Sequence, residues 1–294
     1  MEAKIIKGLP IAEVIREELR NEINILNSKE KNLKLAVILV GNDPGSILYA
    51  QNKIKVGEKV GIIIELQQFS EEIQEKQLVA HIHTLNSDST VNGILIELPL
   101  PKHINKAQIL NVISPLKDVD GVTAVNRGLI LGGQEGASLT PATPIACIEL
   151  LQRSGIELRG RKVTIVGRGD TVGRPLAALL VNRDATVTIC HTKTVNLGEE
   201  CRRADILIAA AGCKHLIKAD MVKPNTVVID DGINQLENGS FTGDVDFTAV
   251  KEVAAVITPV PGGVGSLTTT LIMANTLKAF KMQQRMGDAE NEYL

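Results

Sequence analysis

KVTIVGRGDTVGRP, residues 162–175, decides the fold of half of this chain. An apolar run of strand length passes into Gly167, Gly169 and Gly173, and a helix-forming segment follows. Strand, glycine turn and helix in this order make the phosphate-binding turn of a Rossmann-type sheet, because glycines let the backbone approach phosphates and a helix N-terminus supplies N–H donors. The spacing G-x-G-x-x-x-G is one residue longer than the commonest fingerprint. The strand before this turn and the helix after it therefore predict nucleotide binding more strongly than the glycine spacing does. A purely structural glycine turn is the alternative.

Further apolar runs extend the pattern in both directions. Downstream we predict strands at 185–190, 205–210, 225–230 and 254–260, then a helix at about 267–282 and a frayed tail, GDAENEYL. Upstream we predict a helix at 11–26, a strand at 35–40, a helix capped by Ser46 that runs to about 60, a strand at 61–67, a helix at 71–85 and a strand at 92–98. Alternating strands and helices predict an α/β protein with mostly parallel sheets, and 294 residues suffice for about two domains.

Composition narrows the class of protein. Hydrophobic residues make up 44% and aromatic residues only 2%, with no Trp, two Tyr and four Phe, so the core must be aliphatic. The scarcity of rings excludes an aromatic stacking surface for single-stranded nucleic acid. A net charge of −2 offers no basic surface for nucleic acid or an anionic membrane. No apolar run approaches the about 20 residues of a membrane span.

The four cysteines, Cys147, Cys190, Cys201 and Cys213, form no CxxC pair, and the N-terminus lacks a secretory signal. We therefore expect reduced thiols in a cytoplasmic protein and no metal site.

The end of the second strand of the nucleotide-binding half favours NADP over NAD. NAD sites place an acid there to hold the ribose 2′-hydroxyl, whereas this chain reads Cys190-His191-Thr192-Lys193. Arg168 lies in the glycine turn, and cations without an acid suit a 2′-phosphate. Asp170 argues mildly the other way, because a carboxylate repels phosphates.

A candidate reaction site lies upstream. Tyr49 and Lys53 are four residues apart on one predicted helix and so share a face. The spacing alone is a weak signal, and a half-buried Tyr beside a surface Lys is the structural alternative. Three rigid turns strengthen the functional interpretation: the segment after Glu97, the acidic turn KDVDG at 117–121, and TPVPGGVGSLT at 258–268.

Together these segments make the chain resemble the bifunctional methylenetetrahydrofolate dehydrogenase/methenyltetrahydrofolate cyclohydrolase (FolD) family over nearly its whole length. The resemblance rests on segments in the family's order: VGNDPGSILYAQNKIKVGEKVGI, GILIELPLPKHI, PLKDVDGVTAVNRG, TPATPIACIELL, GRGDTVGRP, ATVTICHTKT, GDVDF and TPVPGGVGSLTTTLIMANT. It implies an N-terminal α/β folate-binding catalytic domain (1–139 plus 265–294), a Rossmann-type NADP domain (140–264), a C-terminal helix that returns to the first domain, and a homodimer. Its substrates would be one-carbon derivatives of tetrahydrofolate.

The resemblance also implies roles for single residues. Lys53 would be the central catalytic residue, assisted by Tyr49, Glu97 and Asp120. The folate would contact a second set of residues: Tyr49, Lys53, Leu98, Pro99, Asp120, Gly262, Gly263 and Val264. NADP would contact a third: Gly167, Arg168, Gly169, Thr171, Val172, Gly173, His191, Thr192 and Ile233. Of the two tyrosines, Tyr293 lies in the polar tail, so Tyr49 is the ring available to a flat pterin.

The family's two reactions make different demands. Hydride transfer to NADP needs alignment, whereas hydrolysis of the methenyl cation to 10-formyltetrahydrofolate needs a proton to move. Glu97 stands where the family normally has Gln. A carboxylate within about 4–6 Å favours the charged ammonium of a lysine. We therefore hypothesise that the dehydrogenase reaction survives better than the cyclohydrolase reaction. Glu97 acting as the base itself is the alternative.

Smaller departures from the family are Ala142 for Cys, Gly169 for Ser, Ser266 for Pro and Asp231 for Val. They keep other hypotheses open: a non-catalytic folate- or NADP-binding paralogue, a dehydrogenase-only variant, or an unrelated NADP dehydrogenase acting on a small acid.

Overall fold

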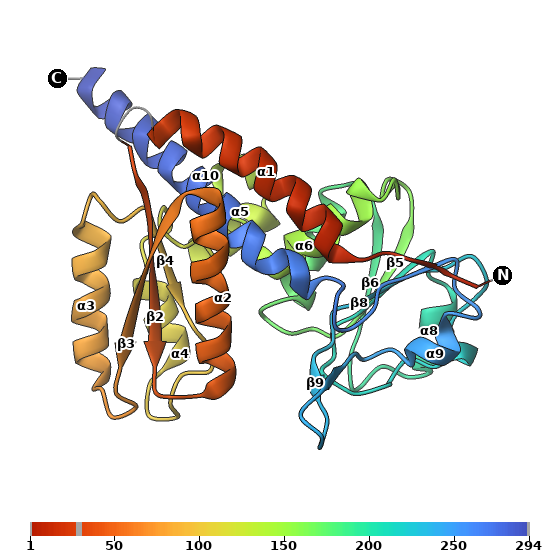
Figure 1. Ribbon diagram of the computed structural model, residues 1–294. Coiled ribbons are helices and arrows are strands. Elements are labelled where there is room, and N and C mark those ends of the chain that lie inside the picture. The colour runs from red at the N-terminus through yellow and green to blue at the C-terminus, as the bar shows by residue number, and fades with distance from the viewer. Residues whose placement is uncertain (1, 28–30, 293–294) are drawn as a thin grey trace. The chain divides into compact units, whose positions relative to one another are not determined.

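The computed structural model of the protein describes residues 2–27 and 31–292, with side chains for 2–26 and 31–286; Tyr293 lies outside this range. The helices and strands, labelled in Figure 1, are β1 (Lys4–Ile5), α1 (Gly8–Asn27), β2 (Leu33–Val40), α2 (Pro44–Val60), β3 (Ile62–Phe69), α3 (Glu75–Ser87), β4 (Gly93–Ile96), α4 (Lys106–Val112), α5 (Ala124–Leu131), η1 (Glu135–Ala137), α6 (Ala142–Arg153), β5 (Lys162–Val166), α7 (Gly173–Val181), β6 (Thr186–Cys190), α8 (Leu197–Arg202), β7 (Ile206–Ala209), η2 (Ala219–Met221), β8 (Val227–Asp230), β9 (Asn234–Gln235), β10 (Phe241–Thr242), α9 (Phe247–Val250), β11 (Val256–Ile257) and α10 (Gly265–Glu292). No described helix is long and apolar enough to cross a membrane.

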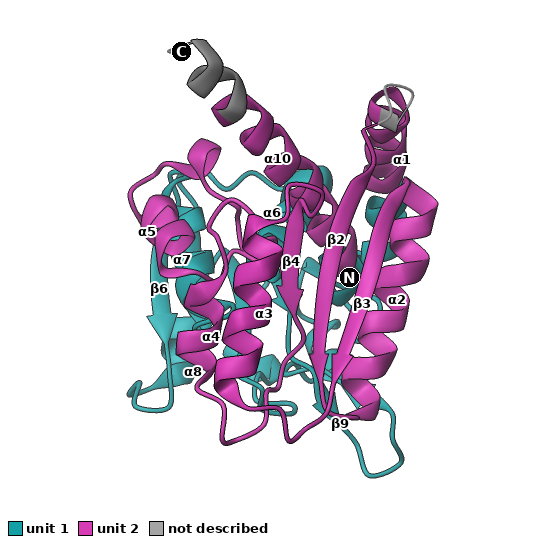
Figure 2. Ribbon diagram, turned by 90° about the vertical axis from the view of Figure 1, so that its left-hand side faces the viewer, with its two compact units in different colours: residues 1–13, 143–268 teal, residues 14–142, 269–294 magenta. Residues whose placement is uncertain are grey.

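The chain forms two compact units, coloured teal and magenta in Figure 2. Unit 1 consists of residues 1–13 and 143–268, and unit 2 consists of residues 14–142 and 269–294. The sequence analysis assigned residues 1–13 to the folate domain. In the structure, β1 pairs in parallel with β11, with Lys4 opposite Val256, and this pairing ties the N-terminal residues to unit 1.

Unit 1 is built on a six-stranded sheet of order β1-β11-β8-β7-β5-β6. Every pairing in it is parallel, which confirms the predicted α/β fold. The five strands expected in this half are all present. The sixth, β1, was missed because two residues are too few to show a hydrophobic period. In a parallel sheet all strands end at the same edge, so the loops that follow β5, β6, β8 and β11 gather there.

Unit 2 is built on a three-stranded parallel sheet of order β3-β2-β4. Figure 1 shows α2 and α3 on opposite sides of these strands. Because side chains alternate along a strand, Ala36, Ile38 and Val40 join the core with α3 and α4, whereas Leu35, Val37 and Leu39 are buried on the other face. The apolar run at 35–40 therefore reads as continuous because both faces of β2 are covered.

The last helix, α10, contributes residues from Thr269 onward to unit 2, as the fold prediction required. Its Asn275 Nδ2 donates to the carbonyl oxygens of Val119 and Thr140, each at 2.7 Å. The helix continues to Glu292, past the predicted end at about residue 282 and into the GDAENEYL segment that was expected to fray.

Helix α2 begins earlier than the sequence indicated. Its N-cap is Asp43, not Ser46, and the Asp43 carboxylate accepts hydrogen bonds from the Ser46 backbone N–H at 2.8 Å and hydroxyl at 2.9 Å. Both residue types are good caps, but Pro44 suits the first helical turn and so moves the cap to the residue before it.

Two buried carboxylates, Asp230 and Asp244, fasten the loops at the carboxyl edge of the unit 1 sheet. Asp230 accepts hydrogen bonds from the backbone N–H groups of Gly232, Asp244 and Val245 at 2.9–3.0 Å. Asp244 accepts from the N–H groups of Ala211, Gly212 and Cys213 and from Asn234 Nδ2, at 2.6–2.9 Å. The segment GDVDF was noted in the sequence, but this fastening role was not predicted.

Removing the Asp244 carboxylate should destabilise unit 1 strongly. We expect Asp244→Ala to lower the free energy of unfolding by at least about 3 kcal/mol, because hydrogen bonds to a charged group contribute about 1.5–3 kcal/mol each. Asp220→Ala, an exposed position in η2 of the same unit, should change it by less than about 0.5 kcal/mol. Urea-induced unfolding of both variants checks this. A loss below about 1 kcal/mol in Asp244→Ala would show that the loops hold without it.

Candidate active site

A buried ion pair joins helix α2 to the end of β4. Lys53 Nζ lies 2.7 Å from Glu97 Oε1, and the two side chains are only 7% and 8% exposed. The geometry follows from the sheet: β2 leads into α2, β4 pairs directly with β2, and the Glu97 N–H donates to the Ile38 carbonyl at 2.9 Å. Burying two charges is costly unless they are paired, and losing one partner leaves an uncompensated charge. Lys53 and Glu97 therefore act as one unit.

Tyr49 lies one helical turn before Lys53. The Lys53 ammonium lies 5.8 Å from the centroid of the Tyr49 ring, within the range of a cation–π contact. The ring is 49% exposed, so it presents a flat apolar surface beside the buried ion pair. This arrangement is the one that the Tyr-x-x-x-Lys spacing predicts.

The segment after Glu97 turns away from the sheet. The Leu98–Pro99 peptide bond is cis, Leu98 is half-buried and Pro99 is exposed. The Ser46 hydroxyl donates to the Leu98 carbonyl at 3.4 Å, so this turn is held against the start of α2.

The acidic turn KDVDG lies next to the ion pair and is organised by Asp118. The Asp118 carboxylate is fully buried and accepts hydrogen bonds from the backbone N–H groups of Val122 and Thr123 and from Asn126 Nδ2, at 2.8–3.0 Å. Gly121 has a φ of +62°, and a Cβ there would crowd Pro141 and the Leu139 carbonyl. The turn is therefore rigid, and it fixes the position of Asp120.

Asp120 carries an unusual carboxyl group. Burial raises its pKa to about 7, with further raising from the neighbouring charges of Asp118 and Glu97, while Lys53 and Arg127 lower it. The carboxyl group therefore changes its charge near neutral pH. Groups with such pKa values are suited to proton transfer in an active site.

Sequence reasoning missed two residues of this site, Asp118 and Arg127. Arg127 lies on α5, and its Nε is buried with no hydrogen-bond partner among the described residues. Its charge acts on Asp120. The spacing of the two acids in KDVDG could have indicated Asp118, because alternating carboxylates in a tight turn often bind backbone N–H groups.

In unit 1 the glycine turn follows β5 as predicted. A Cβ on Gly167 would overlap the Ala210 carbonyl, and one on Gly173 would overlap the Gly167 carbonyl, so both positions require glycine. Residues Arg168–Thr171 are exposed, Val172 is half-buried, and α7 begins at Gly173. Exposed backbone N–H groups that lead into a helix N-terminus make a cradle for phosphate, so the turn fits a nucleotide cofactor. A Cβ on Gly169 would meet no atom closer than 4.0 Å, so the family's usual Ser would fit there.

The end of β6 lies beside this turn. Val166 pairs with Cys190, and the Gly167 N–H donates to the Cys190 carbonyl at 2.9 Å. The exposed Arg168 and Thr192 therefore follow adjacent strand ends. The His191 N–H donates to the Thr194 hydroxyl at 2.8 Å, and His191 Nδ1 accepts from the Lys193 N–H at 3.1 Å, which closes the turn.

The remaining candidates also follow strands of the unit 1 sheet. Ile233, 53% exposed, comes after β8, and Gly262–Val264 come after β11. The Gly262 carbonyl accepts from the Gly8 N–H at 2.8 Å, and Val264 is buried. Asp231, next to Ile233, has a pKa well above its ordinary value because of burial and the nearby Asp230 and Asp244.

The structure thus groups the predicted residues into two sets. Tyr49, Lys53, Glu97 and Asp120 lie together in unit 2, and the residues proposed to bind the cofactor share the carboxyl edge of the sheet in unit 1. Such a chain belongs to the class of α/β enzymes that combine a Rossmann-type nucleotide-binding unit with a unit carrying acid–base residues.

Comparison with known proteins gives the family. The family model described as "Tetrahydrofolate dehydrogenase/cyclohydrolase, catalytic domain" matches residues 6–120, and "Tetrahydrofolate dehydrogenase/cyclohydrolase, NAD(P)-binding domain" matches residues 141–284. Bifunctional protein FolD 2 of Desulfitobacterium hafniense is 51% identical over 285 residues, which cover 97% of this chain and 99% of that protein. The chain belongs to the tetrahydrofolate dehydrogenase/cyclohydrolase family, which confirms the resemblance seen in the sequence.

Solved structures agree with this assignment. The bifunctional enzyme FolD from Campylobacter jejuni is 43% identical with a TM-score of 0.93, covering 95% of this chain and 99% of that one. The FolD of Trypanosoma brucei, complexed with NADP cofactor and inhibitor, is 34% identical with a TM-score of 0.92, covering 97% and 99%.

The carboxyl of Asp120 makes stability depend on pH. It keeps its proton up to about pH 7 in the folded protein but only to about pH 4 in the unfolded chain. This group's contribution to stability therefore decreases as pH rises from about 4 to 7. Between pH 5 and pH 8, we expect the free energy of unfolding of Asp120→Asn to rise by about 2–3 kcal/mol relative to that of the wild type.

Urea-induced unfolding at the two pH values measures this difference, with the exposed Asp220→Asn as the control. If the free energies of unfolding of Asp120→Asn and the wild type differ by the same amount at pH 5 and at pH 8, the raised pKa of Asp120 is contradicted.

Proposed function

We propose that this protein oxidises 5,10-methylenetetrahydrofolate with NADP and hydrolyses the 5,10-methenyl product to 10-formyltetrahydrofolate. The observation that carries the proposal is the buried Lys53–Glu97 pair, with Tyr49 and Asp120 beside it, in a chain of this family. In this proposal unit 2 binds the folate and unit 1 binds NADP. The family models matched to the two halves support this division.

In the first reaction the protein positions the substrate. The exposed ring of Tyr49 packs against the flat pterin or aminobenzoate, and Asp120 hydrogen-bonds to the pterin. Leu98 and Pro99 complete the folate contacts that the resemblance implies within unit 2. Bound NADP would supply the acceptor for the hydride that leaves the methylene carbon. Alignment rather than proton transfer governs this step, so the charge of Lys53 matters little to it.

In the second reaction water adds to the methenyl carbon and loses a proton, and the bond from that carbon to N5 then breaks as N5 takes up a proton, which leaves the formyl group on N10. Lys53 and Asp120 are the groups available to move these protons. The 2.7 Å contact ties Lys53 Nζ to the Glu97 carboxylate, whereas a neutral amide at position 97 would hold the amine less tightly and let it turn toward the added water. We propose that Glu97 therefore slows the cyclohydrolase reaction relative to the dehydrogenase reaction. Glu97 as the base is the alternative that the assays below test.

The preference for NADP over NAD rests on the end of β6. The residues proposed to hold the cofactor phosphates are Gly167, Arg168, Gly169, Thr171, Val172, Gly173, His191 and Thr192, with Ile233 against the ring system. The exposed Arg168 and Thr192 follow adjacent strands and suit a 2′-phosphate, and no acid stands at the end of β6 among the described residues. The NADP-bound relative from Trypanosoma brucei supports this choice.

We also propose a cytoplasmic homodimer that binds neither nucleic acid nor membranes. The resemblance to the family supports the dimer. The free thiols of Cys147, Cys190, Cys201 and Cys213 are consistent with a reducing compartment.

Steady-state assays of the two half-reactions test the proposal. We expect the wild type to reduce NADP with methylenetetrahydrofolate, more efficiently than it reduces NAD. Glu97→Gln should raise the rate of methenyl hydrolysis by about tenfold, a fraction of the about 10²–10⁴-fold that proton transfer contributes, and change the dehydrogenase rate by less than about threefold. Glu58→Gln, an exposed position on α2, is the matched control.

Three outcomes would contradict these statements. Cyclohydrolase activity that is unchanged or lower in Glu97→Gln would overturn the impairment and favour Glu97 as the base. Complete absence of NADP reduction with methylenetetrahydrofolate would overturn the proposed dehydrogenase and favour a non-catalytic binding protein. Binding of NADP without thermal stabilisation by folates would favour a dehydrogenase acting on another substrate.

A further inference from the structure

A polar cavity lies in unit 2, at the opposite edge of the sheet from the Lys53–Glu97 pair. Its volume is about 790 Å³, within the range of small-molecule sites. Lys34 stands at the start of β2 and Asn92 immediately before β4, whereas Glu97 follows the end of β4. Asn92 and Glu97 are five residues apart, so about 16 Å of extended chain separates the cavity from the candidate active site.

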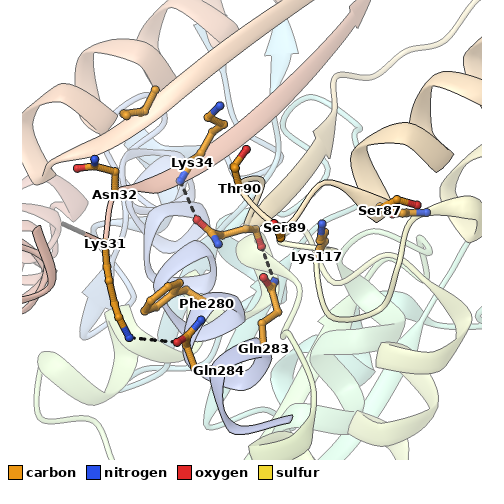
Figure 3. A pocket seen from close by; sticks show the side chains of 13 residues that line it. Lys31, Asn32, Lys34, Ser87, Ser89, Thr90, Lys117, Phe280, Gln283 and Gln284 are labelled. Carbon is orange, nitrogen blue, oxygen red and sulfur yellow. Dashed lines mark hydrogen bonds between the residues drawn. The ribbon is translucent and has the colours of Figure 1, made fainter. Parts of the chain in front are cut away.

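The cavity is lined by cations. Lys31 and Lys34 come from the segment at the start of β2, Lys117 comes from the acidic turn, and all three line the cavity (Figure 3). No carboxylate and no arginine are among the described residues that line it. A concave site with several ammonium groups and no lining acid concentrates anions.

Lys117 is the best evidence that the site is built for an anion. Its side chain is only 7% exposed, and its ammonium donates to two backbone carbonyls, those of Leu85 at 2.9 Å and Asp88 at 2.7 Å. The Asp88 carboxylate offsets part of its charge without a direct ion pair, and the ammonium keeps one N–H for a ligand. Burial lowers the pKa of Lys117, and a bound anion would offset that cost.

The other two lysines have partners that a ligand could replace. Lys31 Nζ donates to Gln284 Oε1 at 3.1 Å, and Lys34 Nζ lies 2.7 Å from Glu65 in a partly exposed pair. Exposed ion pairs contribute little stability, so their rearrangement costs little. The exposed hydroxyls of Ser87 and Ser89 also line the cavity and add hydrogen-bond donors.

We propose that this cavity binds a small phosphorylated metabolite, with the phosphate held by Lys31, Lys34 and Lys117 and by the Ser87 and Ser89 hydroxyls. Compact ammonium and hydroxyl donors suit a tetrahedral phosphate, whereas planar carboxylates are typically bound by arginine. The volume exceeds that of a phosphate ion alone. Ile63, which is exposed and apolar, gives the organic part of the ligand a surface to contact. The proposal does not depend on the folate activity.

Calorimetric titration with inorganic pyrophosphate at constant ionic strength tests the site. We expect one saturable site with a dissociation constant of about 1 mM or lower. Lys31→Gln and Lys34→Gln should each weaken binding by about tenfold. Glu65→Gln, which frees Lys34 from its partner, should tighten it severalfold. Lys76→Gln, an exposed lysine on α3 outside the cavity, should leave it unchanged.

Arg168→Gln separates this site from the glycine turn of unit 1, which is also expected to bind phosphates. Binding that survives Arg168→Gln and is lost in Lys34→Gln supports the proposal. Binding lost only in Arg168→Gln, equal binding in Lys34→Gln and Lys76→Gln, or no saturable binding up to about 10 mM pyrophosphate would overturn it.

Discussion

The buried contact between Lys53 and Glu97, 2.7 Å long, is the interaction on which the rest of unit 2 depends. Neither charge could be buried without the other, so the pairing of β4 with β2 and the path of α2 must keep them together. The contact bears on both the dehydrogenase and the cyclohydrolase reactions, because it holds Lys53 Nζ in a fixed position. Positioning serves hydride transfer, whereas proton transfer needs an amine that can turn toward the reacting water.

Both functional sets follow from the same property of parallel sheets, that their strands end at one edge. In unit 2 this edge carries Glu97, and in unit 1 it carries the glycine turn, the end of β6 and the Gly262–Val264 loop. Buried carboxylates hold the loops at both edges: Asp118 in unit 2, and Asp230 with Asp244 in unit 1. These acids bind backbone N–H groups and leave neighbouring residues such as Asp120 in rigid positions.

Local patterns predicted what depends on local chemistry. The glycine turn at 167–173 and the Tyr49–Lys53 face could be found because their spacing reflects close backbone approach and the helical repeat. Contacts between distant segments could not be found in this way. Only the folded chain shows that such residues lie close together. Examples are the pairing of β1 with β11, the hydrogen bonds of Asp244 to residues 211–213, and the effect of the Arg127 charge on Asp120. The prediction of the α2 N-cap was wrong for another reason. Asp43 and Ser46 are both good N-cap residues, and Pro44 decides between them.

A double-mutant cycle on Lys53 and Glu97 tests the central claim most directly. The cyclohydrolase kcat/KM would be measured for the wild type, Lys53→Met, Glu97→Gln and the double variant. If the two residues act as one unit, their effects are not additive, and the coupling energy is at least about 1 kcal/mol. Additive effects, within about 0.5 kcal/mol, would show that Glu97 does not act through Lys53 and would contradict the account.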